Sequence, residues 1–247
     1  MNSMNIVLLS GGSGKRLWPL SNDTMSKQFL KLLRNDHGEY ESMVQRVWRQ
    51  IHSMQPDSRV FVSSNASQLD TLKRQLGDIE VIQEPSRRDT FPAVALAAAY
   101  FHYEKKLDES EVFVVCPIDV YAEEKYFLLL SEVEKLVSTQ GEKIGLMGVI
   151  PTYPSEKFGY ILQNKGNVSG FVEKPETSKA EGLISAGALW NCGVFALKIG
   201  YVLSLAKKYA EFDSFKSLYE QYEKLPKISI DYEIAEKETS IGVVTYD

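Results

Sequence analysis

The residues with the clearest chemistry lie directly behind the first apolar run of the chain. Ile6–Leu9 is short, apolar and suited to a buried strand, and glycines and cations come immediately after it. Glycine lets a backbone fold tightly and point its N–H groups at an anion. The loop glycines are Gly11, Gly12 and Gly14, and the cations are Lys15, Arg16 and, further on, Lys27. A strand, a glycine loop and nearby cations predict a site for a nucleoside triphosphate.

Two familiar phosphate-binding loops do not fit this stretch. A Walker loop needs a glycine well before its Gly-Lys pair and a Ser or Thr directly after it. Leu9 and Arg16 occupy those two positions here. The dinucleotide-binding fingerprint needs a further glycine where this chain has Leu17. The loop therefore belongs to another kind of phosphate site.

Two carboxylates follow later apolar runs. Glu84 opens a charged segment between an expected strand and an alanine-rich helix. Its carboxylate could accept from both N1–H and N2–H₂ of guanine, a donor pair that adenine lacks, or it could simply face solvent. Asp119 follows the run Val112–Cys116, where it could cap a turn or help to neutralise a triphosphate. Mg²⁺ is typically held by one or two carboxylates together with phosphates, so both interpretations of Asp119 remain open.

The composition is that of a globular protein without a membrane span. The 247 residues are enough to bury a core and could form one large α/β domain or two small ones. A net charge of −5 argues against nucleic acid or an anionic membrane as a partner. No apolar run approaches the roughly 18 residues of a membrane helix, and the N-terminus lacks the features of a signal peptide. Cys116 and Cys192 lie in apolar runs and are expected to be buried free thiols, which indicates the cytoplasm.

Apolar strands alternate with helices through the first two thirds of the chain. The short β-branched runs typical of buried central strands are Ile6–Leu9, Arg59–Ser63, Val112–Cys116 and Ile144–Val149. Helical spacing is found in Ser42–His52, Ala66–Leu76, Pro92–Lys106 and Lys125–Ser138. Thr90 is the expected N-cap of the helix that contains Pro92. This alternation predicts a doubly wound α/β sheet with ligands at the carboxyl ends of its strands.

The alternation of strands and helices changes near residue 150. Short strands are expected at 159–161 and 170–172, a longer one at Leu189–Leu197, and helices at Tyr201–Tyr209 and Phe215–Lys224. No linker, repeat or low-complexity tract interrupts the chain. We therefore expect one continuous domain over residues 1–247, with a substrate-binding lobe in its second part.

A series of segments along the whole chain resembles one enzyme family. The loop reads Gly-Gly-x-Gly-x-Arg-Leu-x-Pro-Leu and is followed by the pair Lys27 and Gln28. The later segments are Glu84–Ala93, Pro117–Asp119, Gly148–Ile161, Phe171–Pro175, Leu189–Phe195 and Ser229–Lys237. Together they resemble the sugar-nucleotide pyrophosphorylases, and most closely the mannose-1-phosphate guanylyltransferases. The resemblance implies a Rossmann-like, three-layer α/β nucleotidyltransferase fold with a mixed, mainly parallel sheet.

The resemblance also implies a reaction and its cofactor. GTP and mannose 1-phosphate would give GDP-mannose and pyrophosphate, with Mg²⁺ bound to the nucleotide. The attacking phosphate oxygen is already anionic, so positioning and charge neutralisation carry the rate without a general base. Residues 1–150 would form a nucleotide-binding half and residues 151–247 a half that binds the sugar phosphate.

Residue roles follow from matching the motifs position by position. The nucleotide-binding residues would be Leu9, Gly11, Gly12, Gly14, Glu84 and Arg88. Arg16 would bind the β- and γ-phosphates, Lys27 the α-phosphate and Lys174 the sugar phosphate, while Asp119 would be the metal ligand. The sugar-binding residues would be Gly159, Glu173 and Asn191, with the glycine letting the sugar ring approach the main chain.

One segment of the family pattern is missing from this sequence. A Trp-Ser-Asp-x-Gly-Ser-Trp stretch with a second metal-binding Asp should follow Val243–Asp247, where the sequence stops. We expect a truncated chain that binds guanine nucleotide but turns over slowly. The alternatives are the same chemistry on another sugar 1-phosphate, such as a heptose, or another nucleotide, and a sugar-nucleotide-binding regulatory module without turnover. The oligomeric state stays open.

Overall fold

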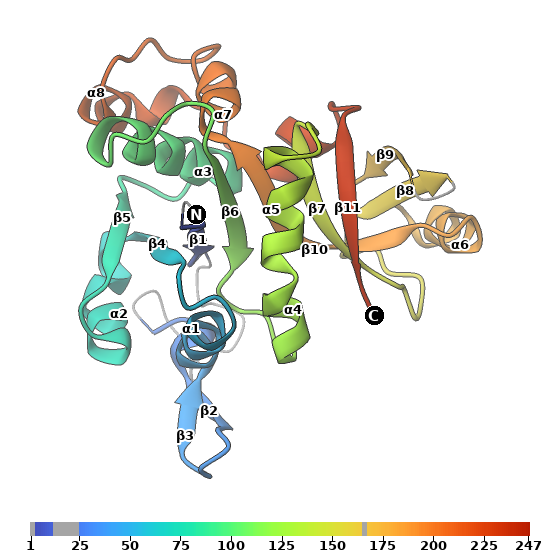
Figure 1. Ribbon diagram of the computed structural model, residues 1–247, viewed down its shortest axis with the longest axis horizontal. Helices are drawn as coiled ribbons and strands as arrows, with labels where there is room; N and C mark the ends of the chain where they lie inside the picture. The colour runs from blue at the N-terminus through green and yellow to red at the C-terminus, as the bar shows by residue number, and fades with distance from the viewer. Residues whose placement is uncertain (1–2, 12–24, 165–166) are drawn as a thin grey trace.

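A computed structural model of the chain describes residues 3–11, 25–164 and 167–247, and its centre is a nine-stranded sheet (Figure 1). The main path of the sheet has the order β11-β7-β10-β6-β1-β4-β5, and β8 and β9 extend it from β10. The strands of the main path are β1 (Asn5–Leu9), β4 (Arg59–Asn65), β5 (Glu80–Glu84), β6 (Val112–Pro117), β7 (Ile144–Val149), β10 (Leu189–Lys198) and β11 (Ile241–Tyr246). The side branch consists of β8 (Tyr160–Asn164) and β9 (Asn167–Val172).

The directions of the strands confirm the mixed, mainly parallel α/β sheet. β1 pairs in parallel with both β4 and β6, β4 with β5, and β7 with β11. On the main path, β10 alone runs the other way, because it pairs antiparallel with β6 on one side and β7 on the other. The first residues of β10 therefore lie at the same edge of the sheet as the last residues of its two neighbours.

Helices cover both faces of the sheet and make the fold three-layered (Figure 1). Successive strand residues point to opposite faces, and Ile6 and Leu8 accordingly pack in one apolar core while Val7 packs in the other. The first core also takes side chains from α1 (Met43–Met54), α2 (Leu69–Leu76), α4 (Glu124–Leu128) and α5 (Leu130–Ser138). The second takes them from α3 (Thr90–Ala99), α7 (Ile199–Ala206) and α8 (Phe215–Glu220). Strands buried on both faces explain the continuous apolar runs of the sequence.

The predicted elements differ from the observed ones mainly at their ends. The expected strand Ile144–Val149 has the observed bounds of β7, whereas the helix expected to run to Lys106 ends as α3 and continues as the π-helical turn η4 (Tyr100–Glu104). The prediction of Thr90 as N-cap is wrong. The helix begins at Thr90, and the Asp89 side chain accepts from the Thr90 N–H at 2.8 Å, so Asp89 is the cap.

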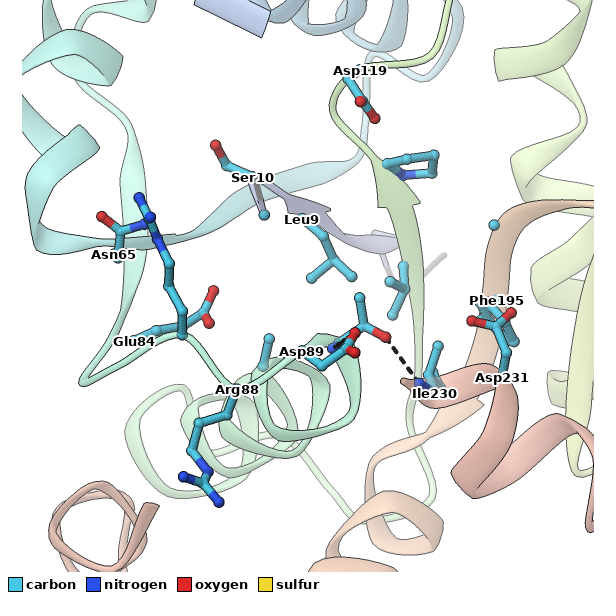
Figure 2. Close-up of a pocket in the computed structure, with 17 residues that line it drawn as sticks. Leu9, Ser10, Asn65, Glu84, Arg88, Asp89, Asp119, Phe195, Ile230 and Asp231 are labelled. Atoms are coloured by element: carbon cyan, nitrogen blue, oxygen red, sulfur yellow. Dashed lines mark hydrogen bonds between the residues drawn. The ribbon is translucent and has the colours of Figure 1, made fainter. Parts of the chain in front are cut away.

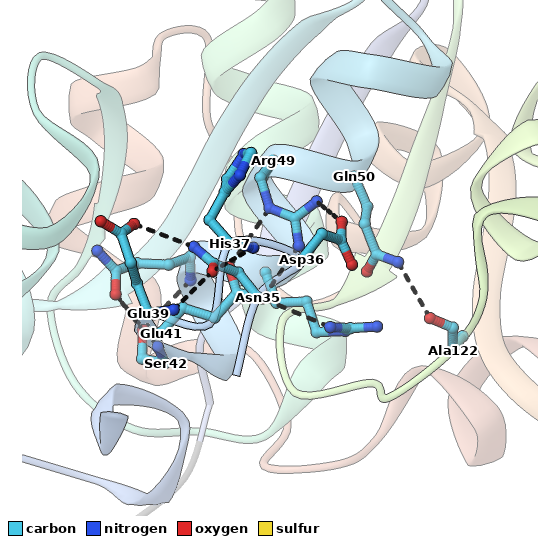
Figure 3. Close-up of polar contacts among 11 residues, drawn as sticks. Asn35, Asp36, His37, Glu39, Glu41, Ser42, Arg49, Gln50 and Ala122 are labelled. Atoms are coloured by element: carbon cyan, nitrogen blue, oxygen red, sulfur yellow. Dashed lines mark hydrogen bonds and ion pairs between the residues drawn. The ribbon is translucent and has the colours of Figure 1, made fainter. Parts of the chain in front are cut away.

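Some elements were not expected from the sequence. They are β2 (Lys31–Arg34), β3 (Tyr40–Ser42), α6 (Thr177–Ser185), β11 and the short turns η2 (Lys27–Phe29) and η6 (Asp231–Ala235). Two further turns, η3 (Ala66–Gln68) and η5 (Tyr222–Lys224), form the first and last residues of helices that the sequence predicted. β2 and β3 form a hairpin that projects below α1 (Figure 1). Figure 3 shows why it stays in place: the buried Glu41 carboxylate accepts from the Arg49 guanidinium of α1 at 3.0 Å. Hydrogen bonding to Glu41 raises the pKa of Arg49, so this guanidinium keeps its charge.

The packing of α5 on β7 leads to a stability prediction. A Cβ at Gly145 would lie 2.5 Å from the main-chain oxygen of Val133, which cannot move without shifting the helix. We expect Gly145→Ala to lower the free energy of unfolding by about 1–3 kcal/mol, the usual cost of overpacking a core. Urea denaturation of the variant measures the loss. Gly170→Ala is the matched control, since no heavy atom lies within 4 Å of its new Cβ, and equal effects of the two variants would contradict the packing argument.

Candidate active site

A pocket of about 360 Å³ opens at the edge where the parallel strands end. The ends of β1, β4, β5 and β6 contribute Leu9, Asn65, Glu84 and Pro117, and Gly193 and Phe195 come from β10. The remaining lining residues lie in loops and helix ends: Ser10, Gly11, Arg87, Arg88, Asp89, Thr90, Ala93, Asp119, Ile230 and Asp231, with Val115 from β6. Figure 2 shows Glu84 and Asp119 at opposite sides of this space. The pocket therefore joins the base-reading and metal-binding candidates of the sequence.

A buried polar network holds the residues on both sides of the predicted phosphate loop. Ser10 Oγ donates to Gln68 Oε1 at 3.0 Å, and Gln68 Nε2 donates to Ser26 Oγ at 2.9 Å. Gln28 Nε2 reaches back to Ser10 Oγ at 3.3 Å. These bonds fix Ser10, which precedes Gly11, together with Ser26 and Gln28, which flank Lys27. Gly12, Gly14, Lys15 and Arg16 lie outside the described residues, so their roles stay predictions.

Lys27 and Asp119 form an ion pair at 2.5 Å beside the pocket. Both side chains are partly exposed, so solvent screens the pair and either group is free to meet a ligand. Among the described residues no three His, Cys, Asp or Glu side chains gather as a ready metal site. The Asp119 carboxylate still suits Mg²⁺, which binds proteins through one or two carboxylates and takes its other oxygens from phosphates and water.

Glu84 presents a carboxylate whose two oxygens are already oriented. Ser63 Oγ donates to Oε1 at 3.0 Å, and the Tyr222 hydroxyl donates to Oε2 at 3.3 Å. Burial raises the pKa of Glu84, and the two hydroxyls and the nearby positive charge of Arg87 oppose that rise. The carboxylate is directed into the pocket (Figure 2) and offers acceptors to a ligand there.

The part of Arg88 next to the main chain lines the pocket, whereas its guanidinium points away from the pocket (Figure 2). Its Nη2 and Nε donate to the Leu225 main-chain oxygen at 2.8 and 3.2 Å, and Nη1 pairs with Glu223. These contacts tie the segment after β5 to the turn η5. A direct contact of Arg88 with nucleotide stays a prediction.

A second cluster joins Glu173, Lys174, Asn191 and Asp231 beside the pocket. Asn191 Nδ2 donates to Asp231 Oδ1 at 2.8 Å, and Asn191 Oδ1 accepts from the Gly193 N–H at 3.1 Å. The Lys174 ammonium pairs with the buried Glu173 carboxylate. Burial opposes the charge on Lys174, but the hydrogen bond and the charge of Glu173 outweigh it and raise its pKa. The cluster thus offers one charged cation, a fixed amide and two carboxylates.

Gly159 fits beside this cluster because it has no side chain. A Cβ there would lie 2.4 Å from the Phe171 ring and 2.5 Å from Glu173 Oε2. Its main-chain oxygen accepts from the Asn191 N–H at 2.8 Å. The space beside Gly159 is therefore taken by Phe171 and Glu173, and the glycine serves to bring the Glu173 carboxylate and Asn191 together.

Comparisons with known proteins agree with this geometry. The sequence pattern of the family described as "Nucleotidyl transferase" matches residues 5–231. The chain belongs to this family. A Thermus thermophilus crystal structure described as a "mannose-1-phosphate geranyltransferase" is 28% identical, with a TM-score of 0.80 over 99% of this chain and 74% of the other.

Two sequence relatives of this nucleotidyl transferase are bacterial. A "Putative mannose-1-phosphate guanylyltransferase" of Vibrio cholerae serotype O1 is 29% identical over 96% of this chain and 55% of its own length. The "Xanthan biosynthesis protein XanB" of Xanthomonas campestris pv. campestris is 31% identical over 100% of this chain and 56% of its own length. The chain thus spans about half the length of these relatives. None of the helices in the described ranges is long and apolar enough to cross a membrane.

The structure of the nucleotidyl transferase adds site residues that the sequence did not single out. Ser63 and Tyr222 hold Glu84, and Asp231 holds Asn191. Asp231 lies in a segment that the family resemblance had marked, so its position could have been suspected. Tyr222 lies in no motif and is 138 residues from Glu84 in the chain, which left no signal for it.

Asp231 gives the stability of the nucleotidyl transferase a testable pH dependence. Burial, together with the charge of Glu173, raises the pKa of Asp231 from 3.8 to about 6. Between these two values the native state holds a proton that the unfolded chain releases, so stability falls as pH rises through this window. A shift of this size corresponds to at most about 3 kcal/mol.

We expect Asp231→Asn to remove this loss, because the amide keeps an acceptor for Asn191 but carries no charge. The free energy of unfolding of the variant relative to wild type should rise by about 1–3 kcal/mol between pH 4.5 and pH 7. Urea titrations at both pH values measure the difference. Asp57→Asn at an exposed turn is the control, and a pH-independent difference for Asp231→Asn would show that this carboxyl has no raised pKa.

Proposed function

We propose that this chain carries the guanylyltransferase centre of an enzyme that converts GTP and mannose 1-phosphate into GDP-mannose and pyrophosphate. The main support for the proposal is that the pocket and the neighbouring cluster are directly connected. One pocket is lined by Glu84, Asp119 and Asp231, and Asp231 is hydrogen-bonded to Asn191 of the neighbouring cluster. The names of the relatives from Vibrio cholerae and Thermus thermophilus support the choice of mannose 1-phosphate.

The reaction needs positioning more than proton transfer. An anionic oxygen of the sugar phosphate attacks the α-phosphorus of GTP, and the bond from that phosphorus to the bridging oxygen breaks as pyrophosphate leaves. Since the nucleophile is already deprotonated, no side chain has to act as a general base. The protein accelerates the step by aligning the two phosphates and by neutralising charge in the transition state.

The nucleotide would lie along the ends of β1, β5 and β6. Glu84 would accept from N1–H and N2–H₂ of guanine, while Leu9 and Gly11 would support the nucleoside. Lys27 would leave its contact with Asp119 to bind the α-phosphate, and Arg16 would meet the β- and γ-phosphates. The N–H groups around Gly12 and Gly14 would complete the phosphate cradle.

Mannose 1-phosphate would lie over the second cluster. Lys174 would pair with its phosphate as a point charge, and Glu173 and Asn191 would bind sugar hydroxyls. Lys174 has φ +43°, a left-handed conformation that costs energy for a residue with a side chain. Its N–H donates to the Phe158 oxygen at 3.2 Å, which helps to hold this conformation and aims the ammonium at the cluster.

A divalent cation fits the nucleotide end of the pocket. We infer that Asp119 contributes one carboxylate ligand to Mg²⁺ and that phosphate oxygens of GTP supply much of the rest. The bound ion would neutralise phosphate charge. We further infer one domain with a nucleotide half at 1–150 and a sugar-phosphate half at 151–247, acting in the cytoplasm on small molecules rather than nucleic acid. The free thiols of Cys116 and Cys192 support that compartment.

A substrate panel tests the proposal directly. The protein is incubated with Mg²⁺, one of GTP, ATP, CTP or UTP, and one of mannose, glucose or heptose 1-phosphate. Released pyrophosphate is measured through coupled hydrolysis to phosphate. The proposal predicts the largest kcat/KM for GTP with mannose 1-phosphate. Preference for another pair would reassign the substrates, and nucleotide binding without pyrophosphate release would identify a non-catalytic module.

The role of Glu84 leads to a prediction about base selectivity. In Glu84→Gln an amide NH₂ would face one of the two guanine donors, so one hydrogen bond is lost and a donor is left unpaired. We expect the ratio of kcat/KM for GTP over ATP to fall by a factor equivalent to about 1–3 kcal/mol. Glu80→Gln, at the opposite end of β5, is the control. An unchanged GTP preference in Glu84→Gln would show that the base is read by other groups.

A further inference from the structure

We propose that Tyr222 is a positioning residue for base selection: its hydroxyl orients the Glu84 carboxylate so that both oxygens can accept from guanine. This inference rests on the proposed guanine-reading role of Glu84. Tyr222 belongs to the turn η5, and its side chain is 1% exposed. It does not line the pocket among the described residues and so acts on the ligand only through Glu84.

The hydroxyl of Tyr222 has a clear geometric relation to Glu84. It donates to Oε2 at 3.3 Å while Ser63 Oγ donates to Oε1 at 3.0 Å. Hydrogen bonds in binding sites are often long before substrate binds and tighten when it does. A buried tyrosine hydroxyl also needs a polar partner, and Glu84 is that partner. The two hydroxyls therefore hold the two carboxylate oxygens from different elements, Ser63 from β4 and Tyr222 from η5.

The acceptor sites left on the Glu84 carboxylate match the donors of guanine in number. An ionised carboxylate has about four lone-pair sites, two on each oxygen. Of the hydrogen bonds among the described residues, those of Ser63 and Tyr222 each use one site on a different oxygen, which leaves a second site on each oxygen for a ligand. Guanine presents two adjacent donors, N1–H and N2–H₂, which match one free acceptor on each oxygen. Inosine keeps N1–H but lacks the amino group, so it tests the second acceptor alone.

The turn η5 is held against the base-reading segment by further contacts. Ser86 Oγ and the Arg88 guanidinium both bind Glu223, and Arg88 also binds the Leu225 oxygen at 2.8 Å. These bonds join the residues just after Tyr222 to the segment that follows Glu84. The Tyr222 hydroxyl is thereby kept at a set place relative to the carboxylate, as a positioning role requires.

The same contacts govern the charge state of Glu84. Burial favours its protonated form, while Ser63, Tyr222 and the charge of Arg87 favour the carboxylate. Arg88 and Glu223 are the other charged groups that act on the Tyr222 hydroxyl. Without that hydroxyl the carboxyl keeps its proton to a higher pH, and a protonated oxygen would donate instead of accepting. Loss of Tyr222 should therefore weaken GTP use more at low pH than at high pH.

The test compares Tyr222→Phe with wild type, using GTP and inosine triphosphate with mannose 1-phosphate. Wild type is measured first. If it prefers GTP over inosine triphosphate, the proposed function is supported; if it shows no such preference, the proposed function fails, whatever the result for Tyr222→Phe. In Tyr222→Phe we expect the GTP-to-inosine ratio of kcat/KM to fall about fivefold to twentyfold, through KM for GTP, as for one lost hydrogen bond to a charged group. The KM for mannose 1-phosphate should not change.

Two further variants keep the proposal falsifiable. Tyr201→Phe removes the hydroxyl of a partly buried tyrosine, which donates to Glu238 at 3.0 Å away from the pocket, and should leave the ratio unchanged. Ser63→Ala removes the partner hydroxyl and should lower the ratio in the same way. An unchanged ratio in Tyr222→Phe, or equal losses for GTP and inosine triphosphate at every pH, would overturn the proposal. If Tyr222→Phe does not fold, an unchanged ratio in Ser63→Ala would also overturn it.

Discussion

The reversed direction of β10 is the constraint on which the site depends. In a purely parallel sheet every strand brings only its last residues to the ligand edge. β10 lies antiparallel between β6 and β7, so its first residues pair with the end of β7, as Asn191 does with Gly148. The register shift between Asn191 and Phe195, with Gly193 at φ +75°, then turns the strand beside Pro117. Asn191 thereby lies beside the pocket, bonded to Asp231 of its lining, on a strand that begins at this edge.

The same strand extends the sheet toward the second half of the chain. β10 pairs with β8 as well as with β7 near Trp190, and β8 pairs with β9, which ends just before Glu173. The net charge of the protein is negative, so it is the order of the strands that brings cationic side chains to the site. Lys174 is held by Glu173, and Lys27 by Asp119, so these two described cations each lie beside a carboxylate. Such pairs hold the cations in place at little cost in stability.

The sequence predicted those parts of the structure that depend on local pattern. The four apolar runs became central strands because burial on both faces selects for continuous β-branched residues, and Asp119 follows one of them as expected. The hairpin of β2 and β3 was missed because its stability comes from the buried pairing of Glu41 with Arg49. The close packing of Phe171 and Glu173 around Gly159 was also hidden, since it depends on β9 and the residue that follows it. Contacts between distant residues leave no periodic signal in one sequence.

One segment near the end of the described chain connects the two halves of the pocket. On one side, the Leu225 oxygen accepts from Arg88, the Ile228 oxygen from the Phe91 N–H at 3.1 Å, and Thr90 Oγ1 accepts from the Ile230 N–H at 2.9 Å (Figure 2). On the other side, the next residue, Asp231, holds Asn191. A shift of this segment would move both partners together. The segment therefore fixes the residues that follow Glu84 relative to the Asn191 amide, and the proposed in-line attack between two bound phosphates requires a fixed spacing of this kind.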